Sequence, residues 1–144
     1  MIELLGGGQS VNAASSSLEI HTHEDVIWII HSGDCNRHNA DAHAEQAERA
    51  IMEVQRAHNR VAIISDLITT HSIDSVYRHK MTTMARRLQP HHPLHIVILR
   101  NPVYRVMVGM SALVIGRTVV TCRGLSEACE LARRSAYSPD PNWK

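Results

Sequence analysis

Phenylalanine is absent from this 144-residue chain, which has only two tryptophans and three tyrosines. Proteins that bind single-stranded nucleic acid stack bases on aromatic side chains, and so few aromatic residues make such a surface unfavourable. The formal net charge of +1 also lacks the excess of basic residues that general nucleic-acid affinity needs. We therefore predict no nucleic-acid partner.

Long apolar runs are missing as well. None approaches the roughly 20 residues that a membrane-spanning helix requires, and the opening MIELLGGGQS has no basic region before an apolar stretch, as a secretory signal would. We predict a cytoplasmic protein without a membrane span. The phosphate-binding patterns GxGxxG and GxxxxGK[ST] are also absent, which disfavours a dinucleotide enzyme, and no cofactor is predicted.

The three cysteines lack any CxxC spacing, and the eleven histidines form no HExxH motif. Reduced thiols are a better interpretation than disulfides or a zinc site, and dispersed histidines are usually surface residues. No metal or catalytic residue is predicted. An enzyme that uses Asp66 with a nearby histidine as an acid–base pair remains an alternative.

The chain divides into a flexible Gly/Ser-rich leader at 1–17, one domain at 18–135 and a loose, proline-containing tail at 136–144. Inside the domain, apolar segments of strand length alternate with segments of helical period, in the order ββαβαβαβα. Continuous apolar strands connected by helices indicate an α/β domain with a mainly parallel sheet and an antiparallel edge strand. The expected strands are Leu18–His23, Val26–Ile30, Val61–Ser65, Leu94–Leu99 and Thr118–Cys122. The expected helices are Asp41–Asn59 with Asn39 or Asp41 as cap, Ile73–Gln89, one opened by Asn101-Pro102 and one capped by Ser126.

The segment between Asp66 and Ser75 carries the most functional information. A strand ends at Asp66, and the next helix is opened by Asp74 and Ser75. A helix N-terminus presents unpaired N–H groups and a positive dipole end, so it suits an anion or a phosphorylated side chain. With Arg78 and Lys80 on the following turn, Asp66 and Asp74 define a predicted turn and anion site. The alternative is that Asp74 or Ser75 only caps the helix.

These residues resemble the STAS domain of anti-sigma factor antagonists. Asp66-Leu67 and Ile73-Asp74-Ser75 match the family's D-L and I-D-S-[ST]-G-L motifs at the same separation, within a similar region of about Leu18 to Ser135. The resemblance implies a non-enzymatic regulatory domain with a protein partner, a kinase or regulator, and Ser75 as phosphoacceptor. Val76-Tyr77 replaces the family's [ST]-Gly, which places the chain nearer a divergent STAS/Sec14-like branch.

The apolar segment Arg100–Gly116 leads to two further expectations. Val103, Met107 and Met110 recur at helical spacing, as ordinary core or as the wall of a pocket for an apolar, lipid-like small molecule. Residues 1–60 hold nine acidic and four basic residues, whereas residues 61–144 hold five acidic and eleven basic ones. Together with a helix that is apolar nearly all round, this asymmetry predicts a homodimer, the alternative being differently charged solvent faces.

Overall fold

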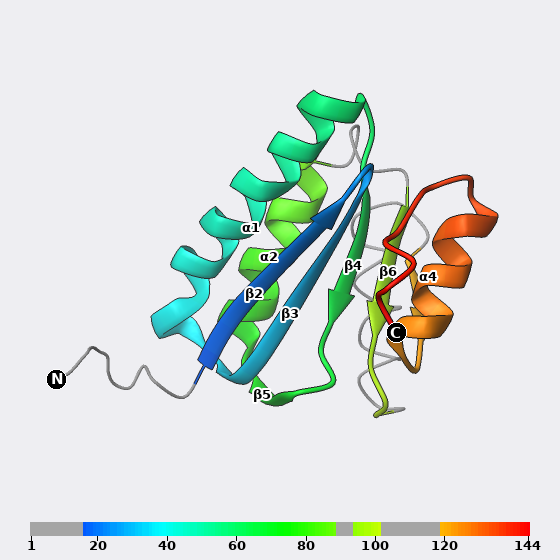
Figure 1. Ribbon diagram of the computed structural model, residues 1–144. Coiled ribbons are helices and arrows are strands. Elements are labelled where there is room, and N and C mark those ends of the chain that lie inside the picture. Colours follow the sequence, from blue (N-terminus) through cyan, green and yellow to red (C-terminus); the bar gives the residue numbers. More distant parts are fainter. Residues whose placement is uncertain (1–15, 89–93, 102–118) are drawn as a thin grey trace, which may run out of the picture.

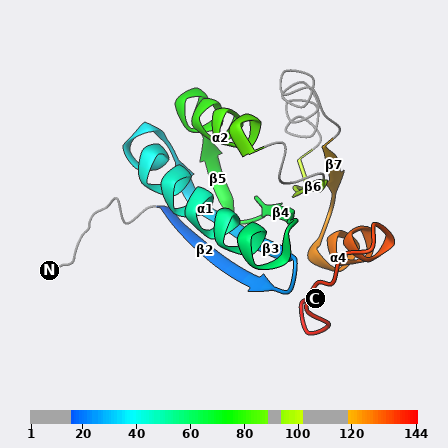
Figure 2. The ribbon, with the colours of Figure 1, turned by 90° about the horizontal axis from the view of Figure 1, so that it is seen from above.

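The computed structural model describes residues 16–88, 94–101 and 119–144. A six-stranded sheet forms the centre, and helices lie on both of its faces (Figures 1 and 2). The strands are β2 (Ser16–His23), β3 (Val26–Cys35), β4 (Ala62–Asp66), β5 (Thr70–Ile73), β6 (Leu94–Ile98) and β7 (Val120–Cys122). The helices are α1 (Arg37–His58), α2 (Ser75–Leu88) and α4 (Leu125–Arg134).

The sheet has the order β2-β3-β4-β6-β7, with β2 antiparallel to β3 and the other pairs parallel. This arrangement confirms the predicted α/β class and the antiparallel edge strand. Strand β5 was not predicted. It pairs with the far end of β3, which continues past Ile30 to Cys35 and so offers free backbone groups beyond the end of β4.

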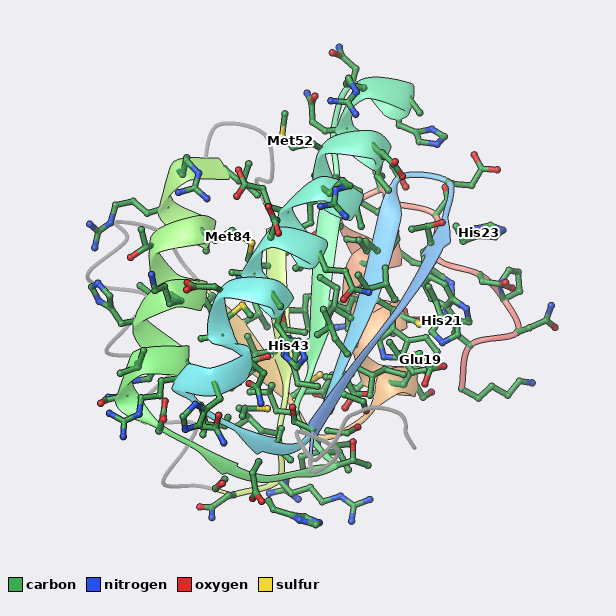
Figure 3. All side chains as sticks on the ribbon, turned by 90° about the vertical axis from the view of Figure 1, so that its left-hand side faces the viewer. Glu19, His21, His23, His43, Met52 and Met84 are labelled. Carbon is green, nitrogen blue, oxygen red and sulfur yellow. The ribbon has the colours of Figure 1, made fainter. Side chains whose placement is uncertain are left out.

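One face of the sheet is covered by α1 and α2 (Figure 2). Side chains alternate between the faces of a strand, so Ile27, Ile29 and Ile63 point to this side. They pack with Ile51 of α1 and with Met84 of α2, which lies between the two helices in Figure 3. The apolar residues of the strands and those of the helices therefore form one core on this face of the sheet.

The opposite face is covered by α4 and by the C-terminal segment that follows it. Tyr137 is only 6% exposed, and the guanidinium of Arg60 lies 4.0 Å from the centre of its ring. The ring of Trp143 lies 5.5 Å from that of Trp28. The segment 136–144, predicted as a loose tail from its prolines and polar residues, is therefore packed onto the domain. Its aromatic side chains, Tyr137 and Trp143, contact Arg60 and Trp28.

Several expectations fall outside the described residues: the leader up to residue 15, the helix opened by Asn101-Pro102, and the pocket candidates Val103, Met107 and Met110. Ser16 and Ser17 belong to β2 and not to the leader. No helix in the described parts of the chain combines the length and the apolar character needed to cross a membrane.

Candidate functional site

The chain reaches the start of α2 through a short connection that is held by the end of β3. Thr70 N–H donates to the carbonyl of Leu67 at 3.2 Å, closing a turn, and β5 then runs beside β3. At its end, Asp74 N–H donates to the carbonyl of Cys35 at 2.9 Å. The residue before α2 is thereby fixed to the residue that ends β3.

The carboxylate of Asp74 caps two helices. Its Oδ1 accepts a hydrogen bond from the main-chain N–H of Tyr77 at 2.8 Å, in the first turn of α2. Its Oδ2 accepts one from the main-chain N–H of Arg37 at 3.0 Å, the first residue of α1. The bond from Tyr77, followed by that from Arg37, lowers the pKa of Asp74, because N–H donors favour the charged carboxylate.

The cap of α1 differs from the prediction. Asn36, and not Asn39 or Asp41, is the cap residue, and its side-chain oxygen accepts from His38 N–H at 2.9 Å. The side chain of Asn39 in turn accepts from Asn36 N–H at 3.1 Å, which completes a reciprocal capping box. Strand β3 continues to Cys35 and α1 begins directly after Asn36, earlier than the predicted Asp41.

Ser75 and Val76 are exposed at the start of α2. Val76 is 39% exposed and is the exposed large hydrophobic residue of the described chain. His71 and Ser72 of β5, a few residues earlier, are exposed too. We refer to His71, Ser72, Ser75 and Val76 as the α2-start surface. Asp74, which precedes Ser75, is hydrogen-bonded to Cys35 and to Tyr77, so the backbone at the start of α2 is fixed in position.

Tyr77, the next residue, points the other way. It is 2% exposed, and its hydroxyl lies 2.7 Å from Nδ1 of His31 on β3 and 2.9 Å from Nδ1 of His43 on α1. Figure 3 places His43 between α1 and the sheet. The large side chain of Tyr77 therefore lies in the interior and leaves Ser75 exposed.

His31, His43 and Tyr77 form a buried hydrogen-bonded cluster. Nδ1 of each imidazole lies within hydrogen-bond distance of the Tyr77 hydroxyl, and the Cys35 thiol is a further hydrogen-bond partner of that hydroxyl. A phenolic oxygen has one hydrogen, so it donates to only one of these groups at a time. Burial, with a smaller contribution from His43, lowers the pKa of His31 to about 3. Burial also lowers the pKa of His43. Both rings are neutral at physiological pH.

Asp66 lies apart from this cluster. It is 8% exposed, its Oδ2 accepts from the indole N–H of Trp28 at 3.0 Å, and its Oδ1 accepts from Ile68 N–H at 3.1 Å. Trp28 packs against the core on the α4 side, opposite the face that α2 covers. Among the described residues, no hydrogen bond joins Asp66 to a histidine, so the structure does not assemble the predicted acid–base pair.

The two basic residues of the predicted anion site, Arg78 and Lys80, have different surroundings. Lys80 Nζ lies 2.9 Å from Asp41 Oδ1 on α1, whereas Arg78 faces a cavity beside α2. The structure therefore does not gather Asp66, Asp74, Arg78 and Lys80 into one anion site.

Ion pairs between α1 and α2 account for part of the charge asymmetry. The Lys80–Asp41 pair and a second pair, between Arg87 and Glu48, both join the basic second half of the chain to its acidic first half. Opposite charges from the two halves of the sequence are thus paired within one chain.

The cavity has a volume of about 160 Å³ and lies between α2 and the sheet. Its walls are mostly aliphatic and include Ile29, Ile63 and Val97 from the sheet and Met81 and Leu88 from α2. An apolar-ligand pocket was expected between the sheet and the helix opened by Asn101-Pro102, so this cavity beside α2 does not test that expectation. The predicted pocket residues themselves are outside the described chain.

Cysteine chemistry and metal binding find no support in the described residues. Cys35, Cys122 and Cys129 are free and buried. Burial raises the pKa of the Cys35 and Cys122 thiols to about 11, so neither provides the thiolate that a nucleophile needs. Within residues 16–88, 94–101 and 119–144, no three side chains of the metal-binding types converge.

Comparison with solved structures identifies the architecture. An anti-sigma factor antagonist from Mycobacterium paratuberculosis superimposes with a TM-score of 0.60 at 21% identity, covering 83% of this chain and 95% of that one. The chain has a STAS-like fold. A protein of the DUF3478 family with a SpoIIAA-like fold, from Shewanella loihica PV-4, matches it with a TM-score of 0.61 at 7% identity, covering 81% of this chain and 93% of that one. No protein-family model matches the chain, and no curated protein matches it significantly.

Within this STAS-like fold, sequence reasoning located Asp74 and Ser75 at the start of α2 but missed the Tyr77 cluster. His31, His43 and Tyr77 come from three elements, and their separations of 34 and 46 residues carry no motif. One signal was available. A tyrosine in the first turn of a helix that packs against a sheet requires a hydrogen-bond partner for its hydroxyl once it is buried.

Proposed function

We propose that this chain is a non-enzymatic, protein-binding regulatory domain of the STAS type, and that the α2-start surface is where its partner binds. The observation that carries the proposal is the exposure of Ser75 and Val76 side by side on a helix start fixed by Asp74. Such a surface gives a partner one apolar contact and one hydroxyl without an ordering cost for the backbone.

The STAS-like fold supports the same proposal by analogy. One neighbour in fold is an anti-sigma factor antagonist, a protein that acts on another protein. Fold alone does not determine function, so the proposal depends mainly on the exposed residues of the α2-start surface. The surface is small, and we infer a partner contact that extends from it to the exposed β5 residues His71 and Ser72.

We further propose that phosphorylation of Ser75 releases the partner. A phosphate at a helix start normally gains from free N–H groups. Here the carboxylate of Asp74 already accepts from Tyr77 and Arg37, and its pKa is lowered by those bonds, so it stays charged beside Ser75. A second anion at Ser75 therefore meets a fixed negative charge, and the surface becomes unfavourable for the partner that binds the neutral form.

A homodimer remains a prediction. The ion pairs of Lys80 and Arg87 with α1 neutralise part of the charge difference within one chain, so that difference no longer requires self-association. Light scattering at micromolar concentration distinguishes the two states, since a monomer has a mass of 16.1 kDa.

Site-specific photo-cross-linking tests the location of the partner surface. A photoreactive amino acid replaces Val76 in one variant and Arg56, an exposed residue of α1, in the control. Both are irradiated in cells of the source organism. We expect a discrete protein adduct at position 76 that is absent at position 56, and the adduct should disappear when Ser75→Asp is added. Equal labelling at both positions would contradict the proposed surface.

A further inference from the structure

Arg78 differs from two other basic residues of α2. Lys80 and Arg87 pair with Asp41 and Glu48 of α1. Arg78 is half-buried and lines the cavity, and in the part of the chain that the structure describes no carboxylate lies within ion-pair distance of it. Carboxylates are the partners that the planar N–H groups of a guanidinium fit best.

The rest of the cavity wall is mostly apolar, although Ser65, Thr82 and His95 also line it. Ile29, Ile63 and Val97 line it from the sheet, and Met81, Ala85 and Leu88 line it from α2. A mostly aliphatic wall of this kind favours an apolar molecule. The methionine adds adaptability, because its flexible thioether adjusts to the shape of a ligand.

The volume limits the size of the occupant. At about 160 Å³ the cavity compares with engineered aliphatic cavities of roughly 150 Å³ that bind benzene. It suits an apolar body of about six to eight carbon atoms. The chain of a membrane lipid is much larger than this volume.

From these two observations we propose that the cavity binds a small organic acid, with its apolar body between α2 and the sheet and its carboxylate on Arg78. The ligand class is a monocarboxylate with a single aromatic ring or a short aliphatic chain. This site is separate from the α2-start surface, whose residues do not line the cavity. The proposal therefore stands or falls independently of the protein-binding function.

The test is a titration of protein with ¹³C-labelled isoleucine methyl groups, followed by NMR. The probes are phenylacetate and hexanoate, with toluene as the neutral control and palmitate as the long-chain control. We expect saturable shifts of the Ile29 and Ile63 methyl signals with both small acids. Ile64 and Ile98 lie in the core on the α4 side, so their signals should stay unchanged and also report that each variant is folded.

Two matched pairs of variants locate the site. Arg78→Gln removes the proposed counter-ion, and Arg86→Gln removes the same charge from an exposed position on the same helix. Ala85→Leu fills the cavity, and Ala42→Leu adds the same side chain to an exposed position on α1. Arg78→Gln and Ala85→Leu should each raise the dissociation constant for phenylacetate at least tenfold, while both controls should leave it unchanged.

The proposal is overturned if neither acid gives saturable shifts at Ile29 and Ile63. It is also overturned if toluene or palmitate binds as tightly as phenylacetate, or if Arg78→Gln binds phenylacetate as the wild type does. Should Ala85→Leu fail to fold, Arg78→Gln still decides the question, because it changes a half-buried side chain at the cavity wall and not the core.

Discussion

The carboxylate of Asp74 lies 3.0 Å from the main-chain nitrogen of Arg37, so the residue that precedes α2 also holds the first residue of α1. Its other oxygen accepts from the main-chain N–H of Tyr77. One side chain therefore sets the start of both helices on this face of the sheet, and the exposed Ser75 sits directly beside it.

We expect Asp74→Ala to lower the midpoint of urea unfolding and Asp74→Asn to lower it less, because asparagine keeps a cap acceptor but lacks the charge. Circular dichroism during urea titration measures both. Ser75→Ala is the adjacent control and should leave the midpoint within experimental error. If Asp74→Ala unfolds at the same urea concentration as Ser75→Ala, the double cap has no energetic role.

Tyr77→Phe should destabilise the domain by about 1–3 kcal/mol, because it leaves the Nδ1 atoms of His31 and His43 without their shared hydroxyl in a buried site. Urea unfolding at pH 7.5 gives the free energy. The ring remains, so lost packing does not explain the change. A loss below about 0.5 kcal/mol would mean that the hydroxyl is not the partner of both rings.

Stability should fall on acidification, and His31 should be a main cause. Its pKa is about 3 in the folded protein, whereas a histidine in the unfolded chain takes up a proton below about pH 6.5. Between these values the unfolded state binds more protons, so the free energy of unfolding decreases as pH falls. For His31 alone the loss between pH 7.5 and pH 5 is about 2 kcal/mol.

Urea unfolding of wild type and His31→Gln at these two pH values checks this expectation. The variant is less stable at pH 7.5, but the difference between its two free energies should shrink by about 2 kcal/mol. His58→Gln, at an exposed position near the end of α1, is the control and should retain the wild-type difference. An unchanged difference in His31→Gln would show that His31 is not the buried neutral group.

Trp143→Ala should destabilise the domain by roughly 1–2 kcal/mol, because the ring packs against Trp28 on the α4 side. The fluorescence maximum of Trp28 should move to longer wavelength as that ring gains contact with water. Lys144→Ala, at the exposed last residue, is the matched control. Wild-type stability and emission after Trp143→Ala would contradict the packing of residues 136–144 onto the domain.

The apolar pattern predicted the sheet well and its polar extension poorly. The predicted strands Val26–Ile30 and Val61–Ser65 correspond to part of β3 and to β4, Ala62–Asp66, because continuous apolar residues are buried between layers of helices. The end of β3 and all of β5 are polar and short, and they form because each supplies the backbone partner of the other. Pairing between distant segments has no local signature, so neither could be predicted.

In the candidate site, too, local features could be predicted from the sequence and contacts between distant segments could not. Asp74 and Ser75 were predictable because helix caps have a local preference for such residues. The contact from Asp74 to Arg37, the inward position of Tyr77 and the cavity beside Arg78 depend on how α1 and α2 sit on the sheet. Asp66 accepts from Trp28, which packs on the α4 side, whereas Asp74 accepts from the first residues of α1 and α2. These separate partners depend on the packing of the two faces and have no local signature in the sequence.

The affinity of the cross-linked partner for Ser75 variants tests the central claim most directly. Isothermal titration calorimetry should give a dissociation constant at least fivefold higher for Ser75→Asp than for wild type, equivalent to ~1 kcal/mol, and an unchanged value for Ser75→Ala. Ser126→Asp adds the same charge near the start of α4, on the opposite face, and should bind as wild type does. Wild-type affinity for Ser75→Asp, or equal weakening by Ser126→Asp, would contradict a partner surface at the start of α2.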